Sequence, residues 1–167
     1  MYQKKRCINQ MKTEFRALSA NESLARSMVC AFISQLSPTV GELSDLRCAV
    51  SEAVTNAIVH AYPMPGRHDT VCVQVWLYDD RSVKLVIRDK GIGITDVARA
   101  MEPMFTTDTT GERSGMGFAI MNCFTDRLKV KSVVGRGTTV EMRRRFERVE
   151  NGACSDEGQR VSRKKYG

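Results

Sequence analysis

Two pairs of alternating apolar segments constrain the fold of this chain more than any other feature. The first pair covers residues 71–77 and 83–87 and is joined by a short acidic turn, and the second covers 128–134 and 138–146 around a glycine turn. Apolar residues at every second position place one face of a strand in a core. The pattern therefore predicts two antiparallel strand pairs in a sheet with one buried face.

Two amphipathic helices are predicted between a first strand and these strand pairs. Weak alternation over 13–18 predicts the first strand, and Ser19 with Glu22 forms a capping-box pattern ahead of apolar residues at helical spacing. Thr39, with Glu42 three residues later, opens a second and longer helix. The apolar stripe of this second helix consists of Leu43, Leu46, Val50, Ala53, Val54, Ala57, Ile58 and Ala61.

Two shorter helices, near 95–101 and over 115–124, are predicted between the strand pairs. The order β-α-α-β-β-α-α-β-β is typical of an α/β fold, here a two-layer sandwich whose mixed, mostly antiparallel sheet is covered on one face by helices. We expect residues 12–146 to form this single domain. Residues 1–11 are expected to be a flexible N-terminal extension and 147–167 a flexible basic C-terminal tail.

The composition favours a cytoplasmic protein. No segment reaches the ~18 apolar residues of a membrane span, and no apolar stretch follows the basic residues at the N-terminus, as a signal peptide would require. The six cysteines are scattered without a C-x-x-C pair, which argues against a zinc site or disulfides and for a reducing compartment. We expect most of these thiols to be small core residues.

The net charge of +7 is concentrated at the two ends of the chain. Residues 1–10 contribute +3 and residues 142–167 contribute +4, whereas 11–141 hold 15 charges of each sign. A folded part without net charge has no overall basic field to attract a phosphate backbone. Direct binding of nucleic acid is therefore not expected.

The segment Glu52-Ala-Val-Thr-Asn56 is the first candidate for a functional site. Residues four apart project from the same side of a helix, and Glu52 and Asn56 lie off the apolar stripe, so they face a cleft or solvent. An amide oxygen is a hard, neutral ligand for Mg²⁺, and a carboxylate one turn away could orient or deprotonate a nucleophile. A solvated polar face is the alternative interpretation of the same pattern.

The segment Asp89-Lys-Gly-Ile-Gly93 is the second candidate, because it interrupts a strand at its C-terminal end. A carboxylate there can accept a hydrogen bond from an exocyclic amine such as that of adenine. Gly91 and Gly93 let the backbone pass close to a flat ligand without interference from a Cβ atom. A simple turn is the alternative.

The third candidate is Glu112-Arg-Ser-Gly-Met-Gly117, which immediately precedes a predicted helix. Glycines at a helix N-terminus leave several backbone N–H groups available to phosphate, and the helix dipole adds to the attraction. Arg113 supplies a cation that can reach terminal phosphate oxygens. An ordinary glycine hinge is the alternative. Neither the G-x-x-x-x-G-K-[ST] loop nor the elements of eukaryotic-type kinases are present in the sequence.

The three motifs together resemble the ATPase/kinase superfamily that joins Hsp90, type II topoisomerases, mismatch-repair clamps and histidine kinases. Within it the chain is similar to the anti-sigma factor serine kinases, and in particular to the anti-sigma F factor family of spore-forming bacteria. The matching stretches are N-E-S-L-A-R (21–26), E-A-V-T-N-A-I-V-H-A-Y (52–62), R-D-K-G-I-G-I (88–94), P-M-F-T-T (103–107), E-R-S-G-M-G-F (112–118) and G-T-T (137–139). The resemblance covers about residues 12–146 and implies nothing for the two ends.

This resemblance implies a Bergerat-type ATP-binding fold that binds ATP and Mg²⁺. Asn56 would coordinate Mg²⁺, and Glu52 would act as general base toward a serine of a partner protein. The adenine would be held by Asp89, with Thr138 nearby. Gly91 and Gly93 would line the base, Thr106 and Thr107 would lie in a lid, and Arg113, Ser114, Gly115, Met116 and Gly117 would hold the phosphates.

The resemblance also implies protein partners. Such a protein is a homodimer that sequesters a sporulation sigma factor when ATP is bound. An anti-anti-sigma protein, which it phosphorylates on serine, releases the sigma factor. Arg26 would belong to a surface that contacts both partners.

Three alternatives stay open at the level of sequence. A stand-alone catalytic domain of a histidine kinase is disfavoured, because no dimerisation helix with a phosphoacceptor histidine precedes the motifs. A pure binding module with ATP as a structural ligand is disfavoured by the presence of Glu52. DNA binding by the basic C-terminal segments 143–145 and 163–165 is a minor alternative. The other interpretation of these segments is a solvated tail.

Overall fold

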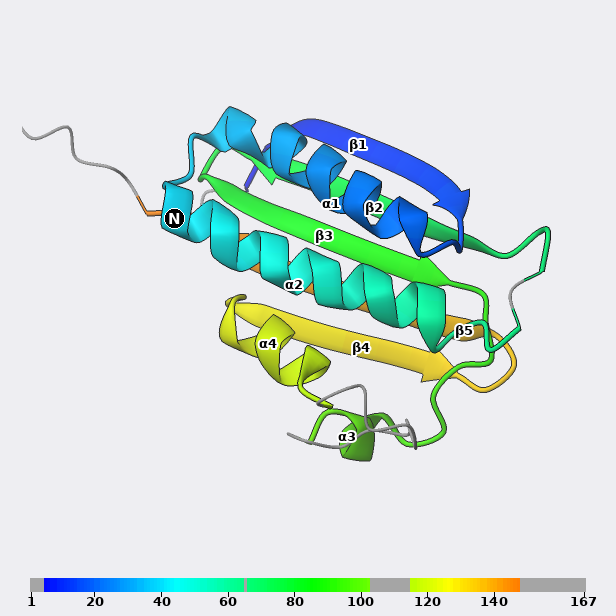
Figure 1. The fold of residues 1–167 in the computed structure, drawn as a ribbon. Coiled ribbons are helices and arrows are strands. Elements are labelled where there is room, and N and C mark those ends of the chain that lie inside the picture. The colour runs from blue at the N-terminus through cyan, green and yellow to red at the C-terminus, as the bar shows by residue number, and fades with distance from the viewer. Residues whose placement is uncertain (1–4, 65, 103–114, 148–167) are drawn as a thin grey trace, which may run out of the picture.

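The computed structural model describes residues 5–64, 66–102 and 115–147. The described chain is a five-stranded sheet with helices packed along it (Figure 1). The order of elements agrees with the predicted one. The elements are β1 (Cys7–Arg16), α1 (Ala20–Ile33), the short 3₁₀ helix η1 (Ser34–Leu36), α2 (Val40–Val59), β2 (Thr70–Tyr78), β3 (Ser82–Asp89), α3 (Val97–Ala100), α4 (Gly117–Cys123), β4 (Arg127–Val133) and β5 (Gly137–Arg145).

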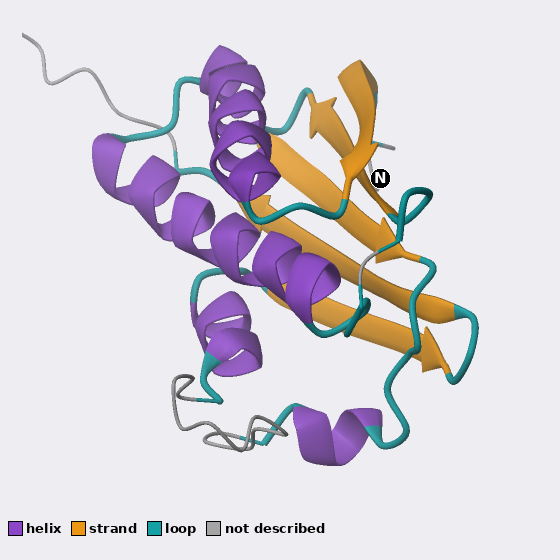
Figure 2. Cartoon of the chain, turned by 45° about the vertical axis from the view of Figure 1, so that its right-hand side comes forward, coloured by secondary structure: helices purple, strands orange, loops and turns teal. Residues whose placement is uncertain are grey.

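The sheet has the strand order β1-β2-β3-β5-β4. Each neighbouring pair of strands is antiparallel. The sequence analysis expected a mixed sheet, but the described strands include no parallel pair. Figure 2 shows α1, α2 and α4 together on one side of the sheet, with the other side left uncovered. The predicted two-layer α/β sandwich is therefore confirmed.

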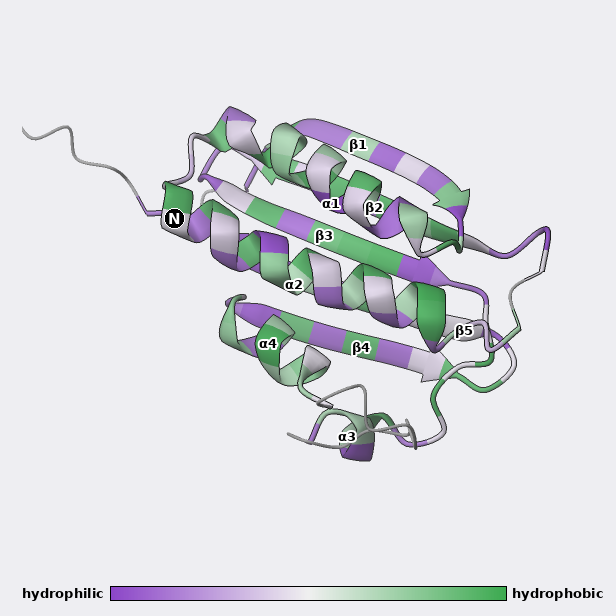
Figure 3. Ribbon diagram, in the orientation of Figure 1, coloured by the Kyte–Doolittle hydropathy of each residue, from purple (hydrophilic) through white to green (hydrophobic). Residues whose placement is uncertain are grey.

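Alternation along the strands places the core between the sheet and the helices. Val71, Val73, Val75 and Leu77 of β2 are fully buried, whereas the residues between them are partly exposed. Figure 3 shows the same alternation along β4 as bands of apolar and polar colour. The spacing of apolar residues thus decides which face of each strand meets the helices.

Helix α2 is the central element of the helical layer. It contacts α1 on one side and α4 on the other, and it packs on β2 and β3. Its buried residues repeat at helical spacing, as the sequence predicts, and comprise Leu46, Ala49, Val50, Ala53, Val54, Ala57 and Ile58. Each polar side chain of α2 is consequently fixed in direction by the buried stripe.

The two helix starts that look alike in sequence differ in structure. The Thr39 Oγ1 accepts a hydrogen bond from the Glu42 backbone N–H at 3.2 Å, and the Thr39 backbone N–H donates to Glu42 Oε2 at 2.8 Å, which is a complete capping box. The predicted capping box at Ser19 is wrong. Ser19 has helical backbone angles rather than the extended ones of a capping residue, and its side chain makes no cap hydrogen bond.

Strand β1 starts earlier than the sequence predicts. Residues 7–11, assigned above to a flexible extension, pair with β2, with Gln10 opposite Trp76 and Met11 opposite Val75. The Arg6 backbone N–H also donates to Asp79 Oδ1 at 3.1 Å. The expected start of the domain at residue 12 is therefore too late. Edge strands carry few apolar residues, so weak alternation there gave little signal.

The expectation that most cysteines are core residues is wrong. Cys7, Cys48 and Cys123 are exposed, Cys30 and Cys72 are half-buried, and these five thiols are free; Cys154 lies outside the described residues. Their positions on the outward faces of helices and strands explain the difference.

Over the described ranges, no helix combines the length and apolar character needed to span a bilayer.

The contrast between the two helix starts gives a stability prediction. Thr39→Ala removes a formed cap and should lower the free energy of unfolding by about 1 kcal/mol. Ser19→Ala removes no cap hydrogen bond and should change it by less than about 0.5 kcal/mol. Urea titrations of the two variants, followed by circular dichroism, measure both. Equal losses would contradict the assignment of the caps.

Candidate functional site

Asp89, the last residue of β3, is a buried carboxylate in the described part of the chain. The residue is 5% exposed. Its Oδ1 accepts hydrogen bonds from the backbone N–H groups of Gly91 at 3.0 Å and Thr138 at 3.1 Å. Burial raises the pKa of Asp89 above its ordinary value, although these two N–H groups pull the pKa in the opposite direction.

The second oxygen of this carboxylate is left for a ligand. Both hydrogen bonds go to Oδ1, and Oδ2 accepts none from the described residues. Oδ2 is not among the buried side-chain atoms that lack a partner in the described residues, which means that it keeps some exposure. Asp89 can therefore accept a hydrogen bond from a bound molecule.

The backbone after Asp89 lies against the C-terminal end of α2. The Ile92 backbone N–H donates to the Ala61 carbonyl at 2.9 Å, and a Cβ atom on Gly91 would overlap that same carbonyl. Gly93 has a φ of +75°, which a residue with a side chain rarely adopts, and its Cβ would meet the Val133 carbonyl. These glycines therefore permit close approach of protein backbone to protein backbone.

Thr138 lies beside Asp89, to which it donates its backbone N–H, and its hydroxyl group is hydrogen-bonded to that of Ser132. The residue is 9% exposed, and its Oγ1 lies 2.9 Å from Ser132 Oγ. Ser132 Oγ also accepts a hydrogen bond from the Ile94 backbone N–H at 2.7 Å. The sequence analysis missed Ser132, although a serine that follows Leu128 and Val130 on the apolar side of β4 is a signal that could have revealed it.

Tyr62 is a second residue that the sequence analysis did not assign to the site. Its hydroxyl accepts from the Lys90 backbone N–H at 2.9 Å and donates to the Thr70 carbonyl at 2.8 Å. The side chain is buried, and this burial raises its pKa above the ordinary value. Tyr62 thereby fixes the segment that follows Asp89 to the start of β2.

Glu52 and Asn56 face the N-terminus of α4, whereas their place off the apolar stripe of α2 predicted only that they face a cleft or solvent. Both side chains are half-buried. A Cβ atom built on Gly117 would lie 3.0 Å from Glu52 Oε2 and 3.3 Å from Asn56 Nδ2. Any larger residue at 117 would therefore crowd these two polar groups. Gly115, two residues earlier, has a φ of +65°, which again favours glycine.

Helix α2 connects the two halves of the site. Asn56 lies three residues before Val59, the last residue of α2, which is roughly 4.5 Å at about 1.5 Å of helical rise per residue. Asp89 is held next to the end of α2 through Gly91, and Glu52 and Asn56 meet α4 one to two turns earlier. The predicted lid and phosphate-binding residues Thr106, Thr107, Arg113 and Ser114 lie outside the described residues.

Arg26 lies apart from this site, on α1. It makes an ion pair with Glu22 at 3.5 Å, and Glu22 in turn accepts a hydrogen bond from Ser51 Oγ at 2.6 Å. The Nε of Arg26 is buried and has no hydrogen-bond partner among the described residues. Arg26 and Arg47 both line a surface hollow of about 380 Å³ between α1 and α2.

The donor set suits a magnesium ion that is held mainly by other ligands. Among the described residues, no group of three or more histidine, cysteine or acidic side chains could hold a metal by itself. Mg²⁺ commonly takes one or two protein oxygens and completes its shell with water and phosphate oxygens. Asn56 beside Gly117 offers one such oxygen next to the start of a helix.

Comparisons with known proteins show the family and the fold of the chain. A family model described as the histidine kinase-like ATPase domain matches residues 15–144. The crystal structure of the RsbU and RsbW domains of a Mycobacterium tuberculosis protein superposes with a TM-score of 0.59 at 16% identity, over 83% of this chain and 32% of that one. At that identity the likeness concerns the fold alone, and it supports the predicted two-layer sandwich.

Relatives of known name are much more similar in sequence. The anti-sigma F factor of Lysinibacillus sphaericus is 50% identical over 141 residues, which are 84% of this chain and 95% of that protein. The anti-sigma F factor of Clostridium acetobutylicum is 45% identical over 143 residues, 86% of this chain and 98% of its own length. The sequence resemblance is thus confirmed, and the chain belongs to the anti-sigma F factor family of histidine kinase-like ATPase domains.

Proposed function

We propose that this protein is an ATP-dependent anti-sigma factor that sequesters a sporulation sigma factor and phosphorylates a serine of its anti-anti-sigma antagonist. The observation that carries the proposal is the approach of Glu52 and Asn56 to Gly117. A potential base and a potential metal ligand there face the start of a helix, where phosphate binds well. The names of the close relatives support the sigma factor as partner.

Asp89 would recognise the adenine. Its Oδ2, which accepts nothing from the described residues, would accept a hydrogen bond from the exocyclic amine. Thr138 lies beside it, and Gly91 and Gly93 would line the base. The hydrogen bonds of Tyr62 and Ser132 would hold this half of the site in place before ATP arrives.

Asn56 would hold magnesium, and the start of α4 would receive the phosphates. The lack of a side chain at Gly117 leaves the amide oxygen of Asn56 accessible from α4. Bound Mg²⁺ would supply neutralisation of the charge on the phosphate oxygens. Arg113, Ser114, Gly115, Met116 and Gly117 would contribute the guanidinium group and the N–H groups that orient the triphosphate.

Glu52 would act as the general base. Its carboxylate would take the proton of the partner's serine hydroxyl while the serine oxygen bonds to the γ-phosphorus. The bond from that phosphorus to the bridging oxygen would break, and ADP would leave with the electron pair. Glu52 is suited to this task because it lies one helical turn from Asn56 on the same side of α2.

Arg26 would contribute to the surface for the sigma factor and the antagonist. Arg26 and Arg47 line the same hollow, so two cations there could meet acidic groups of a partner. We further propose that the protein works as a homodimer, as the resemblance implies, and that Thr106 and Thr107 belong to a lid over the nucleotide.

Separate substitutions of Asn56 and Glu52 distinguish the binding of ATP from the transfer of phosphate. Asn56→Ala should abolish measurable binding of Mg–ATP in calorimetry, because the metal ligand is lost. Glu52→Gln should bind Mg–ATP normally but transfer phosphate to the purified antagonist about 10²–10⁴-fold more slowly. Asn9→Ala and Glu14→Gln, distant exposed positions, serve as matched controls. Transfer by Glu52→Gln at the normal rate would disprove its role as base, and an acid-labile product would indicate phosphohistidine instead of phosphoserine.

The raised pKa of Asp89 predicts how ATP binding depends on pH. The amine of adenine needs the ionised carboxylate, so affinity should fall as the pH is lowered through this pKa, beginning above the ~3.9 of an ordinary aspartate. Asp89→Asn should weaken ATP binding by at least about 10-fold and remove this pH dependence. Calorimetric titrations across the acidic range measure both effects.

The same substitution has an opposite expected effect on stability. An acid whose folded pKa is raised binds its proton more tightly when folded, so its ionised form lowers stability at neutral pH, and this loss disappears as the pH falls. Asp89→Asn should therefore raise the melting temperature of the nucleotide-free protein at neutral pH. A lower melting temperature, together with unchanged ATP affinity, would show that Asp89 is a structural residue.

A further inference from the structure

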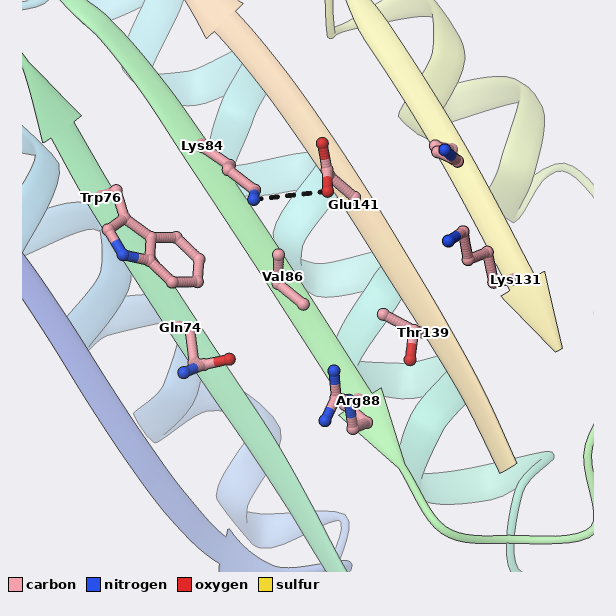
Figure 4. A pocket seen from close by; sticks show the side chains of 9 residues that line it. Gln74, Trp76, Lys84, Val86, Arg88, Lys131, Thr139 and Glu141 are labelled. Carbon is pink, nitrogen blue, oxygen red and sulfur yellow. Dashed lines mark ion pairs between the residues drawn. The ribbon is translucent and has the colours of Figure 1, made fainter. Parts of the chain in front are cut away.

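Asp89, Thr138 and Ser132 point from three neighbouring strands toward the helical side of the sheet. Asp89 ends β3, Thr138 is the second residue of β5, and Ser132 lies opposite Thr138 on β4. Each lies two residues from an apolar residue of its own strand that belongs to the core or packs against it, so it shares the face of that residue. Their neighbours in the sequence point to the uncovered face instead, as Figure 4 shows for Arg88, Thr139 and Lys131.

Ser132 makes three polar contacts through a single hydroxyl group. Its Oγ accepts a hydrogen bond from the Ile94 backbone N–H at 2.7 Å. The same Oγ lies 3.2 Å from the Gly137 carbonyl oxygen and 2.9 Å from Thr138 Oγ1. A hydroxyl group has one proton to donate and two lone pairs with which to accept. Three contacts are therefore as many as this hydroxyl group can make.

Only one arrangement of the two hydroxyl protons makes a hydrogen bond of every contact. A backbone carbonyl only accepts, so Ser132 donates its proton to Gly137. The remaining lone pair of Ser132 then accepts the proton of Thr138. In the opposite arrangement Ser132 would donate to Thr138, and its oxygen would face the Gly137 carbonyl without a proton between them, which is unfavourable. Ser132 thus fixes the direction of the Thr138 hydroxyl proton.

The direction of this proton decides what Thr138 offers to a ligand. Its proton is directed at Ser132, and its Oγ1 makes no other hydrogen bond among the described residues, so the oxygen is left as an acceptor. The Thr138 backbone N–H, which donates to Asp89 Oδ1 at 3.1 Å, holds the two residues side by side. Because Asp89 Oδ2 is an acceptor as well, this end of the site offers a ligand acceptors only.

We propose that Ser132 determines specificity at the nucleotide site and makes the site select adenine over hypoxanthine. This inference rests on the ATP site proposed above. Adenine carries an amine with two N–H groups at the position where hypoxanthine carries a carbonyl oxygen. Asp89 and Thr138 accept from the amine, whereas both repel a carbonyl oxygen in its place. Ser132 acts through Thr138 and is therefore a positioning residue.

A purely structural role of Ser132 predicts a different outcome. Loss of the hydroxyl group leaves the Ile94 N–H without its acceptor, which loosens the segment that follows Asp89. Such loosening weakens the binding of every purine nucleotide by a similar factor. A role in specificity instead changes the ratio of the affinities for two nucleotides that differ only in the group at this position of the base.

The test compares the binding of Mg–ATP with that of Mg–inosine triphosphate, whose base is hypoxanthine, by calorimetry on the full-length protein. The wild type should prefer ATP by at least about 100-fold. Ser132→Ala removes the acceptor of the Thr138 proton, so this proton becomes free to turn toward the carbonyl of hypoxanthine. The preference for ATP should then fall by about 10-fold or more. Ser34→Ala, at an exposed serine of η1, is the matched control and should leave the preference unchanged.

Variants at Thr138 show whether Ser132 acts through this residue. Thr138→Val keeps the shape of the side chain but removes the acceptor, so the preference for ATP should fall by about 5-fold or more in this variant too. Ser132→Ala added to Thr138→Val should change the preference no further, because no hydroxyl proton is left to orient. Ser132→Thr keeps a hydroxyl group and should retain most of the preference. Melting temperatures measured without nucleotide show that each variant is folded.

Three results would overturn the role of Ser132 while leaving the ATP site in place. The first is an unchanged preference in Ser132→Ala, with the affinities for both nucleotides lowered alike, which would make Ser132 a structural residue. The second is an unchanged preference in Thr138→Val, which would remove Thr138 from the recognition of the base. The third is an equal effect of Ser132→Ala with and without the Thr138 hydroxyl group. Failure of the wild type to bind either nucleotide would instead reject the ATP site together with this inference.

Discussion

The close approach of the Asp89–Gly93 segment to the end of α2 is the constraint on which the rest of the site depends. A buried stripe fixes α2 over the sheet, and the Ala61 carbonyl at its end accepts the Ile92 N–H. Only a residue without a side chain fits at 91, because a Cβ atom there would overlap that carbonyl. One contact therefore ties the carboxylate of Asp89 to the same helix that carries Glu52 and Asn56.

The parts of the fold that repeat a pattern could be predicted from the sequence, and the parts that depend on a single local geometry could not. The stripe of α2 and the alternation of β2 contain several buried residues each, so one irregular position does not hide the period. A capping box depends on the backbone angles of one residue. Thr39 has the extended conformation that a cap requires and Ser19 does not, although both precede a glutamate at the same spacing.

The motifs of the candidate site could be found in the sequence, but the contacts between them could not. Glu52 and Asn56 could be placed on one side of a helix, yet only the structure brings Gly117 up to them. The hydroxyl groups of Tyr62 and Ser132 accept hydrogen bonds from backbone N–H groups that lie 28 and 38 residues away in the sequence. The spacing of residues within one helix or strand cannot reveal such contacts.

The position of β4 at the border of the sheet gives its lysines an additional consequence. An edge strand exposes unpaired backbone groups that could recruit a strand from another molecule. Lys129 and Lys131 are exposed on this edge, and a like-charged strand arriving from a second molecule would bring its own lysines into register with them. The edge therefore resists self-templated growth into fibrils, and the sheet ends at β4.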